Sequence, residues 1–329
     1  MHKNSRIFVA GHRGLVGSAI VRRLRALGFD NLALRTHAEL NLADPLATHE
    51  FFESQRPEFV IVAAAKVGGI HANSTLPATF IHTNLAIQTN VLHEAWSAGV
   101  ERLLFLGSSC IYPRECAQPI HEDYLLTGPL EPTNSAYAVA KIAGIEMCRS
   151  YNRQYGTHFL AAMPTNMYGP GDNFDLETSH VLPALLRKTS EAAMRGHDEV
   201  VVWGTGKPRR EFLHSDDLAD GCAMLLSLDT ETFDDFLRSH YYPLINIGYG
   251  EDITIADLAQ LIARKVGYKG RLRFDATRPD GTMRKLMDSS RMRSLGWKPK
   301  IDLEHGIEQM IERLRSDLPA AQAKRAAVA

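Results

Sequence analysis

The 329-residue sequence has few of the features that mark membrane, secreted or nucleic-acid-binding proteins. Its four cysteines, Cys110, Cys116, Cys148 and Cys222, form no C-x-x-C pair and no zinc-ligand spacing with histidine, which argues against a structural metal and a disulfide framework. A formal net charge of -1 gives no general attraction to nucleic acid or to an anionic membrane. No apolar run approaches the roughly 20 residues of a membrane helix, and the start of the chain does not resemble a signal peptide. We therefore expect a cytoplasmic protein with no metal, nucleic-acid or membrane partner.

The chain is rich in short apolar runs that alternate with helical patterns. In the first half, "RIFVAG", "EFVIVAAA" and "RLLFLGSS" are separated by amphipathic segments such as "GLVGSAIVRRLRALG". This alternation predicts parallel βαβ units, and therefore an α/β fold with a Rossmann-type doubly wound parallel sheet. The second half is less regular and suits a smaller C-terminal α/β lobe, while "PAAQAKRAAVA" at the end is expected to be a tail without a function.

A glycine-rich loop, "GHRGLVG", joins the first predicted strand to the first predicted helix. Gly11, Gly14 and Gly17 have the spacing G-x-x-G-x-x-G rather than G-x-G-x-x-G. Glycines at this position allow a tight turn and close approach to a pyrophosphate, which the helix N-terminus binds with its free amides. The simpler alternative is a strand-to-helix turn, but the position between strand and helix favours a dinucleotide site.

The region after the second strand lacks the acid that normally binds the ribose 2'-hydroxyl of NAD, about 20 residues beyond the glycines. It reads "LALRTHAELN", with Arg35 and His37, while Arg13 lies in the glycine loop and Glu39 is a less suitable candidate. Basic groups attract a 2'-phosphate, so NADP(H) is favoured. Otherwise Arg35 and His37 are ordinary solvated residues.

Two further motifs carry groups that perform acid-base chemistry. In "YAVAK", Tyr137 and Lys141 are four residues apart and lie one helical turn from each other. A cation beside a phenol is expected to lower the phenol pKa. In "GSSCIYP", Ser108, Ser109 and Cys110 follow an apolar strand. The alternative for "YAVAK" is an ordinary amphipathic helix. For "GSSCIYP" the alternatives are serines that cap a strand and, at Cys110, a small buried thiol.

Over nearly its whole length the chain resembles the extended short-chain dehydrogenase/reductases that act on nucleotide sugars. "GHRGLVG", "YAVAK", "PTNMYGP" and "REFLHSDDLAD" carry this resemblance. The longer strings "AAAKVGGI", "LGSSCIYP", "EPTNSAYAVAKIAGIEMC" and "VVVWGTGKPRREFLH" are similar to the branch that epimerises GDP-linked 4-keto-6-deoxy sugars at C3 and C5 and reduces them at C4.

The resemblance implies a role for each reactive residue. Tyr137 donates a proton to the C4 oxygen, Lys141 supports it and holds the nicotinamide ribose, and Ser108 hydrogen-bonds the substrate carbonyl. NADPH supplies the hydride. A 4-ketone acidifies the hydrogens on C3 and C5, so a base and an acid on opposite ring faces invert both centres; the resemblance assigns Cys110 as base and His180 as acid. Without the resemblance, Cys110 is interpreted as a buried thiol and His180 as a helix N-terminal residue.

The resemblance also implies the binding residues. Ser109 is expected to contact the cofactor through its backbone, since adjacent strand residues point oppositely. The full cofactor set is Gly11, His12, Arg13, Gly14, Leu15, Val16, Gly17, Arg35, His37, Asn41, Leu42, Leu106, Ser109, Lys141, Pro164, Thr165, Asn166, Met167 and His180. The GDP-sugar set is Lys188, Trp203, Arg210 and Asp280. The family commonly has Arg where His37 stands and Pro where Met283 stands, and neither position belongs to the reactive set.

Two domains and a dimer are expected. An NADP-binding domain comprises residues 1–172 and about 213–248, and a substrate lobe comprises about 173–212 and 249–329. A homodimer is expected through a four-helix interface formed by "TFIHTNLAIQTNVLHEAW" and the Tyr137 helix of each subunit. The alternatives are a nucleotide-sugar 4-epimerase or 4,6-dehydratase, and a non-catalytic NADP-sensing regulator. The lack of acids after Ser108 disfavours a dehydratase, and the presence of Tyr137 and Lys141 disfavours the regulator.

Overall fold

The computed structural model describes residues 1–176, 178–278 and 280–326, and its largest element is a six-stranded parallel sheet. In spatial order the strands are β2 (Leu32–Ala33), β1 (Ile7–Ala10), β3 (Phe59–Val62), β4 (Arg102–Leu106), β5 (Phe159–Pro164) and β9 (Leu244–Ile247). Strand order reverses beside β1, as in a doubly wound sheet. The predicted Rossmann-type α/β fold is therefore confirmed.

Both faces of this sheet are covered by helices, because its strands are apolar in nearly every position, with Arg102 and Asn246 as exceptions. In β1, Ile7 and Val9 point into one core, and Phe8 and Ala10 into the other, as the period of two requires. The first core includes α1 (Leu15–Ala26), α7 (Ser215–Ser227) and α8 (Thr230–Ser239). The second includes α2 (Pro45–Gln55), α4 (Pro77–Ser97) and α5 (Ser135–Tyr155).

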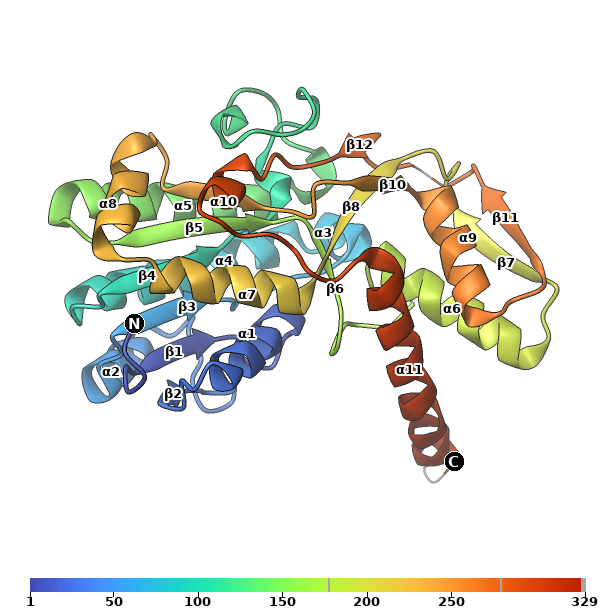
Figure 1. Ribbon diagram of the computed structural model, residues 1–329, viewed down its shortest axis with the longest axis horizontal. Helices are drawn as coiled ribbons and strands as arrows, with labels where there is room; N and C mark the ends of the chain where they lie inside the picture. The colour runs from blue at the N-terminus through green and yellow to red at the C-terminus, as the bar shows by residue number, and fades with distance from the viewer. Residues whose placement is uncertain (177, 279, 327–329) are drawn as a thin grey trace.

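A second lobe lies to one side of the sheet (Figure 1). We use this name for α6 (Val181–Arg195), β7 (Glu199–Trp203), α9 (Ile255–Val266), β11 (Arg271–Asp275) and α11 (Leu303–Ala326). Leu186, Ile262 and Ile311 are among the residues of its own apolar core. Helix α11 runs to Ala326, so the first part of the segment expected to be a tail is helical.

A small sheet connects the two regions. Its central strand β8 (Arg209–His214) pairs with β10 (Asp252–Thr254), β12 (Arg284–Lys285) and β6 (Asn166–Tyr168), which follows directly on β5. The remaining elements are α3 (Ile70–Thr75), α10 (Ser290–Ser294) and the 3-10 turns η1 (Ser109–Ile111), η2 (Glu122–Tyr124) and η3 (Pro132–Asn134). Met292 and Trp297 pack into the first core of the large sheet, although they follow the second lobe's strands in sequence. The domain boundaries stay a prediction.

Candidate active site

The glycine loop forms a cradle of bare backbone between β1 and α1. Gly11 has a φ of +80°, and a Cβ there would lie 2.8 Å from the Ala63 carbonyl carbon. A Cβ on Gly17 would lie 2.1 Å from the Gly11 oxygen. Gly14 caps α1 and has no side chain to bind the first amides of the helix, which begins with Leu15 and Val16. A pyrophosphate fits such a cradle because it accepts from these amides and requires close backbone approach.

Basic groups surround the far end of the cradle. Arg13 and Arg35 are both exposed, and their charges help to lower the pKa of Glu39, although hydrogen bonds from Thr36 are the larger cause. Glu39 accepts from the Thr36 amide at 2.7 Å and from its hydroxyl at 2.8 Å. The single acid of this region is thus engaged locally, and the two guanidinium groups are free of a direct ion pair with it. This arrangement suits a 2'-phosphate better than a ribose hydroxyl.

The other residues expected at this end differ in exposure. His37 and Asn41 are exposed, whereas the Leu42 side chain packs into the second core of the large sheet. The Leu42 carbonyl accepts from the Asn90 amide at 3.0 Å. His12 is partly buried; burial and then Arg13 lower its pKa, and its Nδ1 has no hydrogen-bond partner among the described residues.

The serine and cysteine motif forms a 3-10 turn immediately after β4. Ser108 caps this turn, and its Oγ accepts from the Cys110 amide at 3.5 Å. Ser109 and Cys110 are both buried. Because η1 starts at Ser109, the strand alternation that we used to orient Ser109 does not apply there. A Cβ on Gly107 would lie 1.9 Å from the Met163 methyl, so the chain passes close to β5 before it turns.

Tyr137 and Lys141 lie one turn apart near the start of α5 and face the end of β4. Lys141 is 3% exposed, its Nζ donates to the Leu106 carbonyl at 2.8 Å, and it lies 5.8 Å from the centroid of the Tyr137 ring. Burial lowers the pKa of Lys141 to about 8. Burial also raises the pKa of Tyr137, so the expectation that the lysine lowers it is wrong for this state. Burial, which disfavours the phenolate, is the largest cause, the Cys110 thiol adds to it, and Tyr137 keeps the proton that a donor needs.

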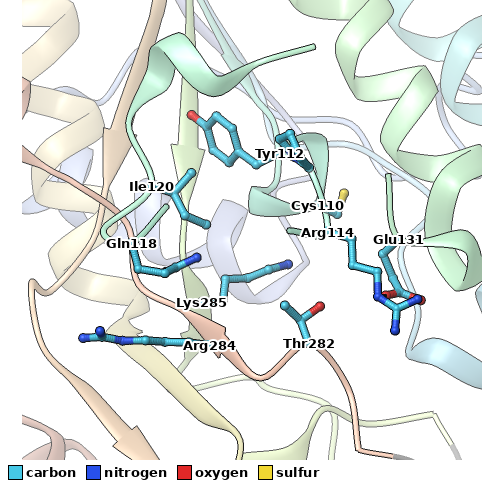
Figure 2. Close-up of a pocket in the computed structure, with 10 residues that line it drawn as sticks. Cys110, Tyr112, Arg114, Gln118, Ile120, Glu131, Thr282, Arg284 and Lys285 are labelled. Atoms are coloured by element: carbon cyan, nitrogen blue, oxygen red, sulfur yellow. The ribbon is translucent and has the colours of Figure 1, made fainter. Parts of the chain in front are cut away.

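Lys285 on β12 is a cation of this site that sequence reasoning missed. It lines a small cavity with Cys110, Thr282 and Glu131 (Figure 2). Burial raises the pKa of the Cys110 thiol, and Lys285 is the largest opposing influence, ahead of Ser108 and Lys141. The cavity thus holds a thiol beside a cation that stabilises its charged form. No sequence signal links these two residues, since they belong to distant segments that meet only through the small sheet.

His180 approaches from the second lobe. It precedes α6 and is exposed at the surface, yet surrounding protein desolvates its ring enough to lower its pKa. Neighbouring protein can desolvate a ring without covering it, so His180 stays accessible to solvent. His180 is not one of the residues that line the cavity around Cys110. The expected base and acid therefore stand on different elements.

The predicted cofactor residues Pro164 to Met167 lie at the end of β5 and the start of β6. Thr165 Oγ1 and Asn166 Nδ2 both donate to the Glu211 carbonyl, at 3.3 and 2.8 Å. Met167 packs partly against the first core. The carbonyl of Leu106, at the end of β4, accepts the hydrogen bond from Lys141 Nζ. These residues follow the carboxyl ends of neighbouring strands, which is where open α/β sheets bind ligands.

The four expected GDP-sugar residues form two groups. Trp203 is 58% exposed, with Lys188 Nζ 4.9 Å from its ring centroid and the unpredicted Arg278 5.0 Å from it. Asp280 accepts from the Thr205 amide at 2.9 Å and its hydroxyl at 2.6 Å, which holds the turn after Trp203. An exposed indole with two cations near its ring suits an aromatic base that carries phosphates.

Arg210 lies apart from the tryptophan group. It pairs with Lys285 across β8 and β12, and its Nη1 donates to the Thr282 carbonyl at 2.5 Å. Burial lowers its pKa, and Asp280 opposes this effect. Arg210 thus lies between the cavity around Cys110 and the exposed Trp203.

The fold and this site are those of an α/β enzyme that uses a dinucleotide cofactor. Comparison with known proteins identifies the family. The family model "NAD dependent epimerase/dehydratase family" matches residues 7–236. The chain therefore belongs to the NAD dependent epimerase/dehydratase family.

Within this family the chain is similar to GDP-L-fucose synthases. GDP-L-fucose synthase 1 of Arabidopsis thaliana is 57% identical over 93% of this chain and 92% of that protein. GDP-L-fucose synthase of Escherichia coli (strain K12) is 54% identical over 92% of this chain and 94% of that protein. Among solved structures, MlghC, the GDP-mannoheptose C4 reductase from Campylobacter jejuni with NADP bound, is 42% identical and has a TM-score of 0.86 over 95% of this chain and 98% of that chain.

Proposed function

We propose that the chain acts as a GDP-L-fucose synthase: it converts GDP-4-keto-6-deoxy-D-mannose to GDP-L-fucose by epimerisation at C3 and C5 and reduction of the C4 ketone with NADPH. The observation that carries the proposal is the proximity of two acid-base sets, Tyr137 with Lys141 and Cys110 with Lys285; the Cys110 thiol interacts electrostatically with all three of the other groups. The identity of 54% to GDP-L-fucose synthase of Escherichia coli (strain K12) supports it.

Epimerisation requires a base that removes the hydrogens next to the ketone. Cys110 is the base in this proposal: Lys285 and Lys141 stabilise its thiolate, and Ser108 orients the turn. A sugar carbonyl at Ser108 and Tyr137 accepts their hydrogen bonds, which stabilises the enediolate that forms when Cys110 takes the proton. His180 delivers a proton to the opposite ring face, and the inverted ketone is the result.

Reduction of the C4 ketone uses the set formed by Tyr137 and Lys141. Tyr137 remains protonated because burial raises its pKa, so it donates a proton to the C4 oxygen as the alcohol forms. Lys141 is held at Leu106 and stands ready to reprotonate the phenolate. When bound in the glycine cradle and along residues 164–167, NADPH supplies the hydride for C4. Arg13 and Arg35 favour NADPH over NADH, and Lys188, Trp203, Arg210 and Asp280 hold the GDP.

Incubation of the protein with GDP-4-keto-6-deoxymannose and NADPH in deuterated water tests this function. GDP-L-fucose is expected, with solvent deuterium at C3 and C5. Cys110→Ser is expected to bind NADPH normally and to lose exchange at both carbons, because a serine hydroxyl is far less acidic than a thiol. Cys116→Ser is the matched control, since Cys116 lies outside the reactive cavity. Exchange by Cys110→Ser at the wild-type rate would contradict the role of the thiol.

The same experiment separates the alternatives. A GDP-sugar C4 reductase without epimerase activity, the reaction suggested by MlghC, consumes NADPH and leaves C3 and C5 without deuterium. A regulator that only senses NADP binds the cofactor and produces neither change. His180→Asn is expected to permit exchange while little inverted product forms, because the acid rather than the base is missing.

We also propose a homodimer through α4 and α5, in the cytoplasm. No helix in the described part of the chain is long and apolar enough to cross a membrane. On the outer side of α4 and α5, Trp96 stacks on Tyr155 at 4.2 Å, and Tyr155 and Val139 are 46% and 44% exposed. Such apolar surface is typical of an interface. Light scattering after size-exclusion chromatography is expected to give twice the chain mass for the wild type and a smaller mass for Val139→Glu.

A further inference from the structure

Glu211 is a fully buried carboxylate in the middle of β8, and no role has been assigned to it. Its side chain is 0% exposed. Burial raises the pKa of this carboxyl, while hydrogen bonds from the amides of Gly250 and Met287 oppose the effect. A buried carboxylate is unfavourable unless its oxygens are satisfied, so its contacts indicate what it holds in place.

The two carboxylate oxygens of Glu211 bind different segments. Oε1 accepts from the Gly250 amide at 2.7 Å, and Oε2 accepts from the Met287 amide at 3.0 Å. A Cβ on Gly248 would lie 2.3 Å from Oε1, so a glycine is needed for the chain to pass this carboxylate. Glu211 thus joins the loop after β9 to the segment that carries β12.

The Met287 contact helps to hold the segment that carries Lys285, together with the pairing of Lys285 and Arg210 across β12 and β8. Lys285 is the last residue of β12, two residues before Met287. On the other side, Ile120 donates to the Leu286 carbonyl at 2.7 Å and accepts from Asp288 at 2.9 Å. The segment after Lys285 is therefore held between Glu211 and the chain that follows Cys110.

The main chain of residue 211 makes contact with the cofactor side. Its carbonyl accepts from Thr165 and Asn166, which belong to the predicted NADPH set. The carboxylate and the carbonyl of one residue thus hold the two sides of the cleft. The carboxylate also accepts from the Tyr249 amide and the Thr165 hydroxyl, so NADPH affinity is measured beside exchange to separate the two sides.

We propose that Glu211 is a positioning residue that holds Lys285 against Cys110 and thereby sets the rate of proton transfer at C3 and C5. The inference rests on the proposed function. Cys110 also faces Lys141 and Tyr137 from α5, Ser108 from the cap of η1, and, around the cavity, the Arg114–Glu131 ion pair and Arg284. Of these charged groups, Lys285 has the largest effect on the thiol, and its strand is held by pairing with β8 and by the Glu211 contact at Met287.

Glu211→Gln keeps the size of the side chain and removes one of the two acceptor oxygens. Deuterium exchange at C3 and C5 is measured from acid to alkaline pH, together with NADPH affinity and reduction of the C3,C5-inverted 4-ketone. With Lys285 displaced, the alkaline limb of the exchange profile is expected to move to higher pH, and the rate near neutrality to fall about tenfold per pKa unit. NADPH affinity and reduction of the inverted ketone are expected to change by no more than about twofold, because they do not use the thiol.

Glu122→Gln is the matched control. Glu122 is also a buried carboxylate; its Oε1 accepts from the Asn246 amide of β9 at 2.8 Å and its Oε2 pairs with Arg291 of α10 at 3.3 Å, so neither oxygen binds β12 or Met287. This variant is expected to lose stability without a shift of the exchange profile. An equal shift in both variants, or a parallel loss of exchange and reduction in Glu211→Gln, would overturn the proposal.

A double mutant tests whether Glu211 acts through Lys285. If it does, Lys285→Met already removes the cation that stabilises the Cys110 thiolate. The double variant Lys285→Met/Glu211→Gln is then expected to exchange deuterium as slowly as Lys285→Met alone. If the exchange rate of the double variant falls by the product of the two single-variant losses, Glu211 acts by a route other than Lys285. Absence of exchange in the wild type would instead refute the proposed function, so the two failures are distinguishable. Should Glu211→Gln fail to bind NADPH, Glu211→Asp, which keeps both oxygens on a shorter side chain, is expected to bind NADPH and show the same shift; an unshifted profile in this variant would refute the positioning role.

Discussion

Lys141 is a buried cation whose replacement is expected to stabilise the cofactor-free protein while it abolishes reduction. The lysine is 3% exposed, and burial lowers its pKa from 10.5 to about 8. Between these values the unfolded state binds more protons than the folded state, so the stability of the wild type rises with pH across this interval. Below pH 8, charged Lys141 opposes folding.

The magnitude follows from the same two values. At about 1.4 kcal/mol per pKa unit, the difference between 10.5 and about 8 amounts to about 3 kcal/mol of lost stability at pH 7. Lys141→Met removes this penalty but leaves the Leu106 carbonyl without its donor, which offsets about 1 kcal/mol. The net expectation is a variant that is about 2 kcal/mol more stable at pH 7.

Urea unfolding of the cofactor-free wild type and variant at several pH values measures this difference. The advantage of Lys141→Met is expected to be constant below pH 8 and to disappear as the pH approaches 10.5. Lys207→Met, which replaces an exposed lysine, controls for the loss of one charge. A variant that is less stable than the wild type at pH 7, or an advantage independent of pH, would refute the reasoning.

Three further predictions concern the cofactor and the two reactive sets. Arg13→Ala and Arg35→Ala are expected to weaken NADPH more than NADH in calorimetric titrations, and equal losses would contradict the 2'-phosphate role. Gly17→Ala is expected to abolish detectable binding of either cofactor, because its methyl group would lie 2.1 Å from the Gly11 oxygen; unchanged affinity would show that the cradle relaxes. Tyr137→Phe is expected to bind NADPH and to exchange deuterium, while its reduction rate falls by about 10² to 10⁴; a rate near that of the wild type would identify another acid.

The parts of the site that lie within one element could be predicted from the sequence. The glycine cradle is readable because an apolar strand, three glycines and an amphipathic helix follow one another directly. Tyr137 and Lys141 are readable because one helical turn brings them together. In both cases the local geometry that the pattern implies is sufficient to bring the groups together.

Contacts between distant segments could not be predicted in this way. Lys285 reaches Cys110 only because β12 pairs with β8, and Arg278 reaches Trp203 through a turn of the second lobe. The pKa of Tyr137 was also beyond sequence reasoning, because helical spacing gives the neighbouring lysine but not the degree of burial. Leu42 shows the converse: the residue follows the second strand as expected, but packing directs its side chain into the core.

The same burial has opposite consequences for the two steps of the proposed reaction. Tyr137 must hold its proton until the C4 oxygen accepts it, and burial alone meets this requirement by raising the phenol pKa. Cys110 must lose its proton, and burial opposes that loss, so the thiol needs a nearby cation. Burial lowers the pKa of both lysines, but Lys285 lines the cavity around Cys110, whereas Lys141 is held at Leu106 beside the phenol. Two neighbouring buried groups can therefore serve as proton donor and proton acceptor, because only the acceptor is matched with a cation from the second half of the chain.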